Sequence, residues 1–227
     1  MKLSIDANNV SAENQLADTA KTKYHIVSGE KKRIAMIGNS ITLHGIKEDI
    51  GWHGEWGMAA SCKEKDYCHL IIHDYRKDHP DTSFMICQAA DWEINFDISC
   101  DEYPEQLRAV LNFAPDIVVL RLGENCRREY CEEHDFDHSF MQLCEYLGKN
   151  GAKLIITNSF WYSPWTDEEI KKATQKCDGL YVELSDLGDM DEMKAIGLFE
   201  HSGVAAHPGD KGMRAIADRI LEALLKL

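Results

Sequence analysis

Residues 33–42 read RIAMIGNSIT, a short apolar run that leads directly into a glycine, an asparagine and a serine. An apolar run of this length is typical of a strand that is buried on both faces of a sheet. Similar runs follow in the chain, at 83–88 (SFMICQ), 116–122 (DIVVLRL), 153–158 (KLIITN) and 180–184 (LYVEL). The sequence therefore predicts five buried strands.

Amphipathic segments separate these strands. Apolar residues recur with the i, i+3, i+4, i+7 spacing of a helix in segments that begin at Tyr67, Leu107, Phe136 and Met213. Alternation of strands and helices favours a parallel sheet with helices on both of its faces. We expect one α/β domain over residues 29–227, a three-layer α/β/α sandwich with a mostly parallel five-stranded sheet. Residues 1–28 are polar and lack a clear period, which predicts an N-terminal extension.

Composition excludes several classes of protein. Of the 227 residues, 44% are hydrophobic and 28% are charged, which is typical of a globular chain rather than a disordered one. No apolar run approaches the roughly 20 residues of a membrane helix, so no membrane partner is expected. A net charge of −14 repels phosphate backbones and argues against a nucleic-acid partner. The first residues, MKLSIDANN, lack the apolar core of a secretory signal, and we expect a cytoplasmic protein.

The eight cysteines are interpreted as reduced thiols that pack as small hydrophobic side chains. Zinc is the alternative, but the chain has no C-x2-C pair. The cluster of His134, Asp135, Asp137 and His138 resembles a metal site, yet charged runs of this kind usually lie at solvated helix starts. We expect neither a metal nor a cofactor.

In a parallel sheet, ligands bind beyond the carboxyl ends of the strands. The residues that follow the first three predicted strands are NSIT (39–42), AADWE (89–93) and GEN (123–125), and HPGDKG (207–212) precedes the last helix. A serine, an asparagine and a histidine are therefore expected at one edge of the sheet. Acyl transfer needs a nucleophile, donors for an oxyanion and a base, and these residue types supply them.

These segments carry a family resemblance. IGNSIT (37–42) resembles the GDSxT block of the SGNH (GDSL-type) hydrolases, GEN is similar to the start of their GxND block, and HPGDKG is similar to their terminal histidine block. The order and spacing of the blocks agree with the family. The resemblance implies a flavodoxin-like sandwich in which Ser40 is the nucleophile and His207 the general base. It also implies an oxyanion hole built from the N–H groups of Ser40 and Ala90 and the side-chain amide of Asn125.

The residue types agree with these roles. A serine at a strand-to-helix turn presents Oγ at the tip of the sheet, near the positive end of the following helix, and Gly38 permits a tight turn there. A structural interpretation stays open for each residue: Ser40 as a helix cap, Asn125 as a turn residue, and His207 packed against Pro208.

The chain departs from the family pattern at three positions. Asn39 replaces the aspartate beside the nucleophile, and Ala90 stands where the second block usually has a glycine. Val204 occupies the position, three residues before the histidine, of the aspartate that usually orients it. Either a main-chain carbonyl orients His207 or a remote carboxylate such as Glu200 or Glu93 does. We expect a carbonyl from residues 200–206.

Tryptophans follow several of the predicted strands. Four of them are predicted to bind substrate by stacking on a sugar ring or lining an acyl pocket: Trp52, Trp56, Trp92 and Trp161. The alternative is that they anchor long loops onto the core. His44 and His53 could also contact substrate, but histidines in loops are more often merely exposed, and we expect both to be exposed.

These observations predict a serine esterase that hydrolyses small acyl, acetyl-type esters, with an acylated carbohydrate as the small-molecule substrate. One alternative is a lipid or thioester acyl-hydrolase of the same fold. Another is a catalytically silent glycan-binding module. A nucleotide-binding loop is disfavoured, because GNSITLHG matches neither G-x-G-x-x-G nor the P-loop pattern.

Overall fold

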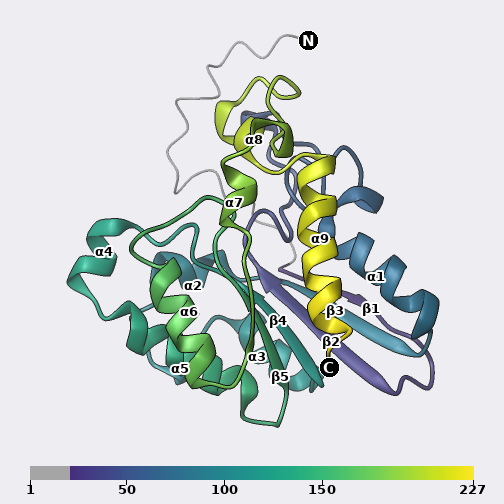
Figure 1. Ribbon diagram of the computed structural model, residues 1–227, viewed down its shortest axis with the longest axis vertical. Helices are drawn as coiled ribbons and strands as arrows, with labels where there is room; N and C mark the ends of the chain where they lie inside the picture. Colours follow the sequence, from purple (N-terminus) through teal and green to yellow (C-terminus); the bar gives the residue numbers. More distant parts are fainter. Residues whose placement is uncertain (1–20) are drawn as a thin grey trace.

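A computed structural model describes residues 21–227 of the chain. Its sheet contains five parallel strands: β2 (Lys32–Gly38), β3 (Thr82–Gln88), β4 (Ile117–Arg121), β5 (Lys153–Thr157) and β6 (Leu180–Val182). They lie in the order β3-β2-β4-β5-β6 (Figure 1). Each of these strands falls within or beside a predicted one, and the parallel α/β architecture is confirmed.

The sheet has a sixth strand that the sequence analysis missed. β1 (Thr22–His25) pairs antiparallel with β3, with Thr22 opposite Cys87 and His25 opposite Phe84. It lies within residues 1–28, which the sequence analysis predicts as an N-terminal extension and does not include in the sheet. An edge strand pairs on one side only and needs no apolar run, so TKYH gives no strand signal. Residues 1–20 of the predicted extension lie outside the described residues.

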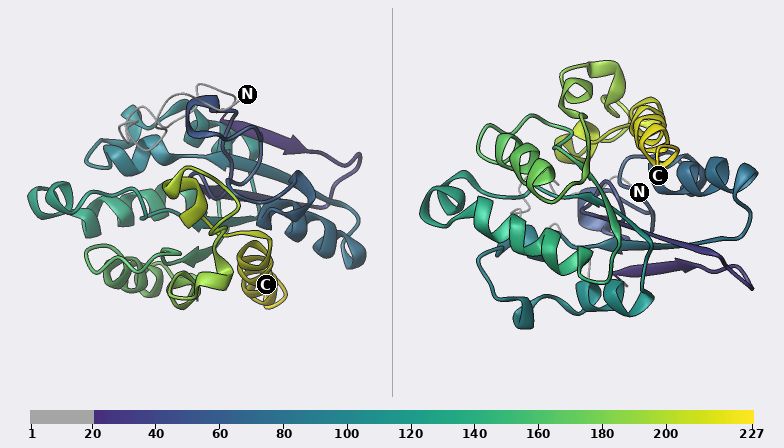
Figure 2. Two further views of the ribbon diagram at one scale, coloured as in Figure 1. Left: turned by 90° about the horizontal axis from the view of Figure 1, so that it is seen from above. Right: turned by 60° about the horizontal axis from the view of Figure 1, so that its bottom comes forward.

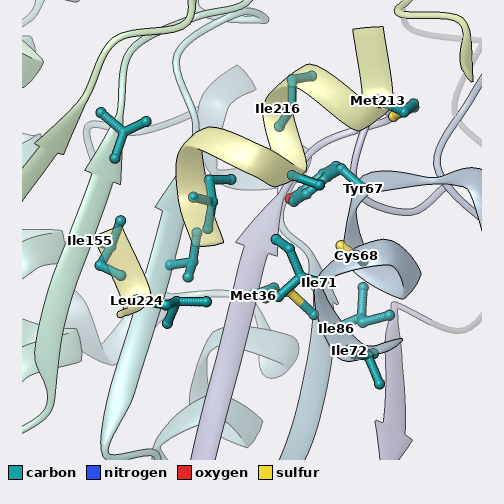
Figure 3. Close-up of a cluster of buried hydrophobic side chains, with 14 of the residues drawn as sticks. Met36, Tyr67, Cys68, Ile71, Ile72, Ile86, Ile155, Met213, Ile216 and Leu224 are labelled. Carbon is teal, nitrogen blue, oxygen red and sulfur yellow. The ribbon is translucent and has the colours of Figure 1, made fainter. Parts of the chain in front are cut away.

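Helices cover both faces of the sheet. α1 (Tyr67–Asp78) and α9 (Asp210–Leu224) pack on one face, and α3 (Glu105–Phe113), α5 (Phe136–Gly148) and α6 (Asp167–Lys176) on the other (Figures 1 and 2). Side chains of β2 alternate between the two cores. Met36 lies in the same core as Tyr67 and Met213 (Figure 3), and Ile37 lies in the opposite core. This two-sided burial explains why the strands read as continuous apolar runs.

Short elements occupy the connections. They are the helices α2 (Ala90–Ile94), α4 (Arg128–Glu133), α7 (Ser185–Gly188) and α8 (Ser202–Ala206), and the 3₁₀ turns η3 (Glu48–Ile50), η4 (Lys63–Lys65), η5 (Cys100–Glu102) and η6 (Asp191–Met193). Within residues 21–227, no helix has the length and apolar character needed to cross a bilayer.

The strand order creates a switch point beside β2. From β2 the chain moves to β3 on one side and then returns to β4 on the other side. Connections that leave in opposite directions open a crevice beyond the carboxyl ends of the two strands. Ser40 follows β2 and Asn125 follows β4, so the topology brings these two segments to that crevice.

Candidate active site

The Ser40 hydroxyl contacts the His207 imidazole across 167 positions of sequence. Ser40 Oγ lies 2.8 Å from His207 Nε2. Ser40 comes from the turn after β2, and His207 from the short link between α8 and α9. The tertiary structure thus joins the first and last of the three blocks that resemble the SGNH family.

The turn that holds Ser40 differs from the expected strand-to-helix turn. The N–H groups of Thr42 and Leu43 both donate to the Asn39 carbonyl, and the next α-helix among the described residues is α1, at Tyr67. The dipole of an adjoining helix therefore does not act on Ser40, and that expectation was wrong. Gly38 is needed for close packing, because a Cβ there would lie 1.9 Å from Thr42 Oγ1.

The second nitrogen of His207 meets a main-chain oxygen. His207 Nδ1 lies 2.7 Å from the Gly203 carbonyl oxygen, within the predicted range 200–206, although those residues include α8 rather than forming an open loop. Val204 is buried in a satellite core with Trp52. Neither alternative carboxylate takes this place, since Glu200 is exposed and Glu93 binds other groups.

The surroundings of His207 keep its ring uncharged. Desolvation of the imidazole lowers its pKa to about 4, and nearby His44, Arg121 and His201 act in the same direction. The bond to the Gly203 carbonyl raises the pKa, but it does not offset the desolvation. A neutral imidazole at neutral pH is able to accept the serine proton through Nε2.

The two further groups of the implied oxyanion hole lie at the ends of β3 and β4. Ala90 is the first residue of α2, where N–H groups have no acceptor within the helix, and Ala89 N–H donates to the Gly38 carbonyl at 2.7 Å. Asn125 Nδ2 donates to Glu93 Oε2 at 2.5 Å. An amide nitrogen carries two hydrogens, so this bond occupies one of them.

Glu93 is the acceptor at the centre of a buried polar cluster that the sequence analysis did not foresee. Its Oε1 accepts hydrogen bonds from Gly123 N at 2.6 Å and from Asn39 Nδ2 at 3.1 Å. Burial and the charge of Glu124 raise the pKa of Glu93 to about 7, against the lowering effect of its donors. The sequence analysis considers Glu93 only as a partner for His207.

Arg121 completes this cluster from the end of β4. Its fully buried guanidinium pairs with the Glu124 carboxylate, and its Nη1 donates to Asn39 Oδ1 at 3.3 Å. Glu124 Oε2 also accepts from Asn39 Nδ2 at 2.7 Å, and Glu124 Oε1 from Phe160 N at 2.9 Å. The only sequence signal for this cluster was a charged residue inside an apolar strand, the arginine of DIVVLRL.

The prediction of substrate binding is wrong for two of the four tryptophans. Trp92 is fully buried and packs against Phe96 and Phe140 in the core beneath α2. Trp52 is also buried, with its ring against Trp56 and Phe199. Their ring faces are covered by protein, so these residues anchor loops, as the alternative interpretation proposed.

The other two tryptophans are partly buried. Trp56 donates from Nε1 to the Ala60 carbonyl at 3.0 Å. The ring of Trp161 stands edge-to-face on His207, with centroids 5.1 Å apart. Trp161 is therefore the predicted aromatic residue that lies directly beside the Ser40–His207 pair. His44, expected to be exposed, is buried, and its Nδ1 lies 2.7 Å from the Gly45 carbonyl oxygen; His53 is exposed as expected.

The residues considered for metal binding have other partners. His134 pairs with Asp97 and Asp137 with Lys176, while Asp135 caps α5 through the N–H of His138. Within residues 21–227, no group of three or more potential ligands is arranged to hold a metal ion. All eight cysteines lie in this range, and all are free thiols.

Comparison with known proteins finds matches at the level of three-dimensional structure. No family model and no curated protein matches the chain. The psychrotrophic esterase EstA from Pseudoalteromonas sp. superposes with a TM-score of 0.55 at 12% identity, over 86% of this chain and 98% of EstA. A family two carbohydrate esterase from Cellvibrio japonicus gives 0.53 at 14% identity, over 87% of this chain and 61% of the other.

A third solved structure, a two-domain esterase active on acetylated mannans, gives a TM-score of 0.50 at 17% identity, over 88% of this chain and 50% of that one. The chain shares the α/β/α sandwich fold of these three esterases. Identities this low concern the fold alone. In this fold, the segments that hold Ser40, Asn125 and His207 all lie beyond the carboxyl edge of the sheet.

Proposed function

We propose that this protein is a serine esterase that removes small acyl, acetyl-type groups from a carbohydrate. The observation that carries the proposal is the contact of 2.8 Å between Ser40 Oγ and His207 Nε2, with Nδ1 held by the Gly203 carbonyl. A hydroxyl paired with a neutral, oriented imidazole is the arrangement that activates a serine nucleophile.

In the acylation step, Ser40 Oγ attacks the ester carbonyl carbon while His207 Nε2 accepts its proton. The carbonyl π electrons move to oxygen, and the resulting oxyanion is stabilised by the Ser40 and Ala90 N–H groups and the Asn125 amide. Collapse of this intermediate breaks the bond to the alcohol oxygen, which takes the proton from His207. The product of this half-reaction is an acyl-serine and a free alcohol.

Water completes the cycle by the same route. His207 accepts a proton from water as the water oxygen attacks the acyl-serine, and then returns a proton to Ser40 Oγ as the carboxylic acid leaves. The imidazolium formed in each half-reaction bonds to the neutral Gly203 carbonyl rather than to a carboxylate. A carbonyl stabilises this charge less than a carboxylate does, so we expect modest turnover.

The carbohydrate assignment has two supports. Trp161 lies edge-on to the His207 ring, and Tyr162 and Trp165 of the same segment are exposed, which supplies aromatic surface for a sugar. Two proteins of the same fold are described as a carbohydrate esterase and as an esterase active on acetylated mannans.

A hydrolysis screen with active-site labelling tests the proposal. Acetylated sugars and short-chain esters are expected to turn over at least roughly tenfold faster than long-chain acyl esters and acyl thioesters. A fluorophosphonate probe is expected to label Ser40, and labelling is expected to disappear in Ser40→Ala. Faster turnover of long chains would favour a lipid acyl-hydrolase, and the absence of both turnover and labelling would favour a glycan-binding module.

A further inference from the structure

The carboxylate of Glu93 joins the three segments that carry the proposed oxyanion hole, which are the turn after β2, α2 and the segment after β4. It extends from α2, four residues after Ala89, toward the ends of both β2 and β4. We propose that Glu93 is a positioning residue, whose carboxylate orients the Asn125 amide toward the oxyanion and ties that amide to the turn that holds Ser40. This inference rests on the proposed function, because it assigns Glu93 a role in the same reaction.

The hydrogen bonds to Asn125 determine its orientation. Oε2 of Glu93 accepts from Asn125 Nδ2 at 2.5 Å, and Oε1 accepts from Gly123 N at 2.6 Å. A flipped amide would set the Asn125 oxygen against a carboxylate oxygen, so only the orientation with nitrogen toward Glu93 is favourable. Because the amide is planar, the direction of its second N–H is then determined as well.

The same carboxylate reaches the nucleophile turn through Asn39. Asn39 Nδ2 donates to Glu93 Oε1 at 3.1 Å and to Glu124 Oε2 at 2.7 Å, while its Oδ1 accepts from Arg121 Nη1. An aspartate at position 39 would set a third carboxylate against two others. The asparagine at position 39, a departure from the SGNH pattern, therefore suits the positions of both Glu93 and Glu124.

The hydrogen-bond donors around Glu93 favour its ionised form, whereas burial and Glu124 oppose it. All of its hydrogen-bond partners, Asn39, Gly123 and Asn125, are donors, and a protonated carboxyl would direct its own hydrogen at one of them. The titratable and charged groups around it are Glu124, the Arg121 that pairs with Glu124, and the Cys126 thiol. Burial and Glu124 raise its pKa to about 7, so ionisation occurs within the working pH range.

A double-mutant cycle tests the role. Glu93→Gln keeps the shape of the side chain but replaces one acceptor by a donor, so the amide of Asn125 or the N–H of Gly123 loses its partner. With a short-chain acetyl ester, we expect kcat to fall roughly 10–100-fold with KM within about twofold, since loss of an oxyanion donor typically costs 10²–10³. Combined with Asn125→Ala, it should cause no further loss beyond about threefold.

Asp167→Asn is the matched control. Asp167 is a second buried carboxylate, and it accepts from Ser159 N and Ser163 N at 3.1 Å rather than from the oxyanion segments. In the double variant with Asn125→Ala, the fall in kcat should equal the product of the falls caused by Asp167→Asn and Asn125→Ala alone. If Glu93→Gln also multiplies fully with Asn125→Ala, or leaves kcat unchanged, the positioning role is overturned.

The wild-type pH profile provides a measurement that no folding defect affects. If ionised Glu93 is required, kcat/KM should fall as pH drops below about 7. Protonation of His207 should cause a separate fall near pH 4. A single acidic limb near pH 4 would overturn the inference while leaving the esterase intact. Activity that persists in Ser40→Ala would instead overturn the proposed function itself.

Discussion

His207 Nδ1 bonds to the carbonyl oxygen of Gly203, four residues earlier in the chain, at 2.7 Å. This contact joins the second residue of α8 to the residue that follows the helix, and it replaces the carboxylate that the SGNH pattern would supply from position 204. A main-chain carbonyl selects the tautomer with a proton on Nδ1 and leaves Nε2 as the acceptor for Ser40. The imidazole is therefore oriented without a nearby negative charge, which agrees with its lowered pKa.

Ser40→Ala and His207→Ala are expected to reduce kcat by similar factors, on the order of 10⁴, because the hydroxyl and the imidazole act as one unit. The double variant should be no slower than either single variant. Steady-state kinetics on an acetyl ester with circular dichroism as a folding control measures this. Ser40 is partly exposed in its turn, so loss of the hydroxyl should leave the melting temperature nearly unchanged.

Val204→Asp introduces the residue that the SGNH pattern has at this position but is not expected to create a triad. Val204 is 1% exposed among apolar neighbours, and the Gly203 carbonyl already occupies His207 Nδ1. Burying a carboxylate there should lower the free energy of unfolding by about 2–4 kcal/mol. Urea denaturation and kcat measure the two effects, and a rise in kcat would contradict this interpretation.

Asn39→Asp is expected to lower both stability and activity, since it brings a third carboxylate against Glu93 and Glu124. Repulsion raises the pKa of a carboxylate in the folded state, so the folded protein binds a proton more tightly than the unfolded chain does. The resulting loss of stability should grow as pH rises from about 5 to 8. Denaturation at several pH values, with wild type as reference, measures this trend, and a constant difference would contradict it.

Trp161→Ala is expected to weaken hydrolysis of acetylated sugars more than that of a small aryl acetate. Contact with an aromatic face is worth roughly 0.5–1.5 kcal/mol, which predicts a KM up to about tenfold higher for the sugar ester. Tyr24→Ala is the control, because Tyr24 is an exposed aromatic residue that packs against Phe113 at the end of α3. Equal losses on both substrates would indicate that Trp161 only supports His207.

Local sequence patterns predicted the parallel sheet, its main helices and the two blocks whose Ser40 and His207 meet in the structure. Apolar runs such as 33–38 indicate strands that are buried on both faces of the sheet. The block around Ser40 follows a strand, and the block around His207 precedes the last helix. These signals depend on neighbours along the chain, so they are readable without the fold. The carbonyl partner of His207 was predictable for the same reason, since Gly203 lies only four residues away.

The tertiary structure alone decided which polar groups meet and which aromatic rings stay accessible. Glu93 and Asn39 are 54 positions apart and come together because β3 and β2 are neighbours in the sheet. Trp92 follows a strand in the same way as Trp161 does, yet it turns into the core while Trp161 stands beside His207. Side-chain direction in a connection depends on packing against distant elements, and no local periodicity encodes it.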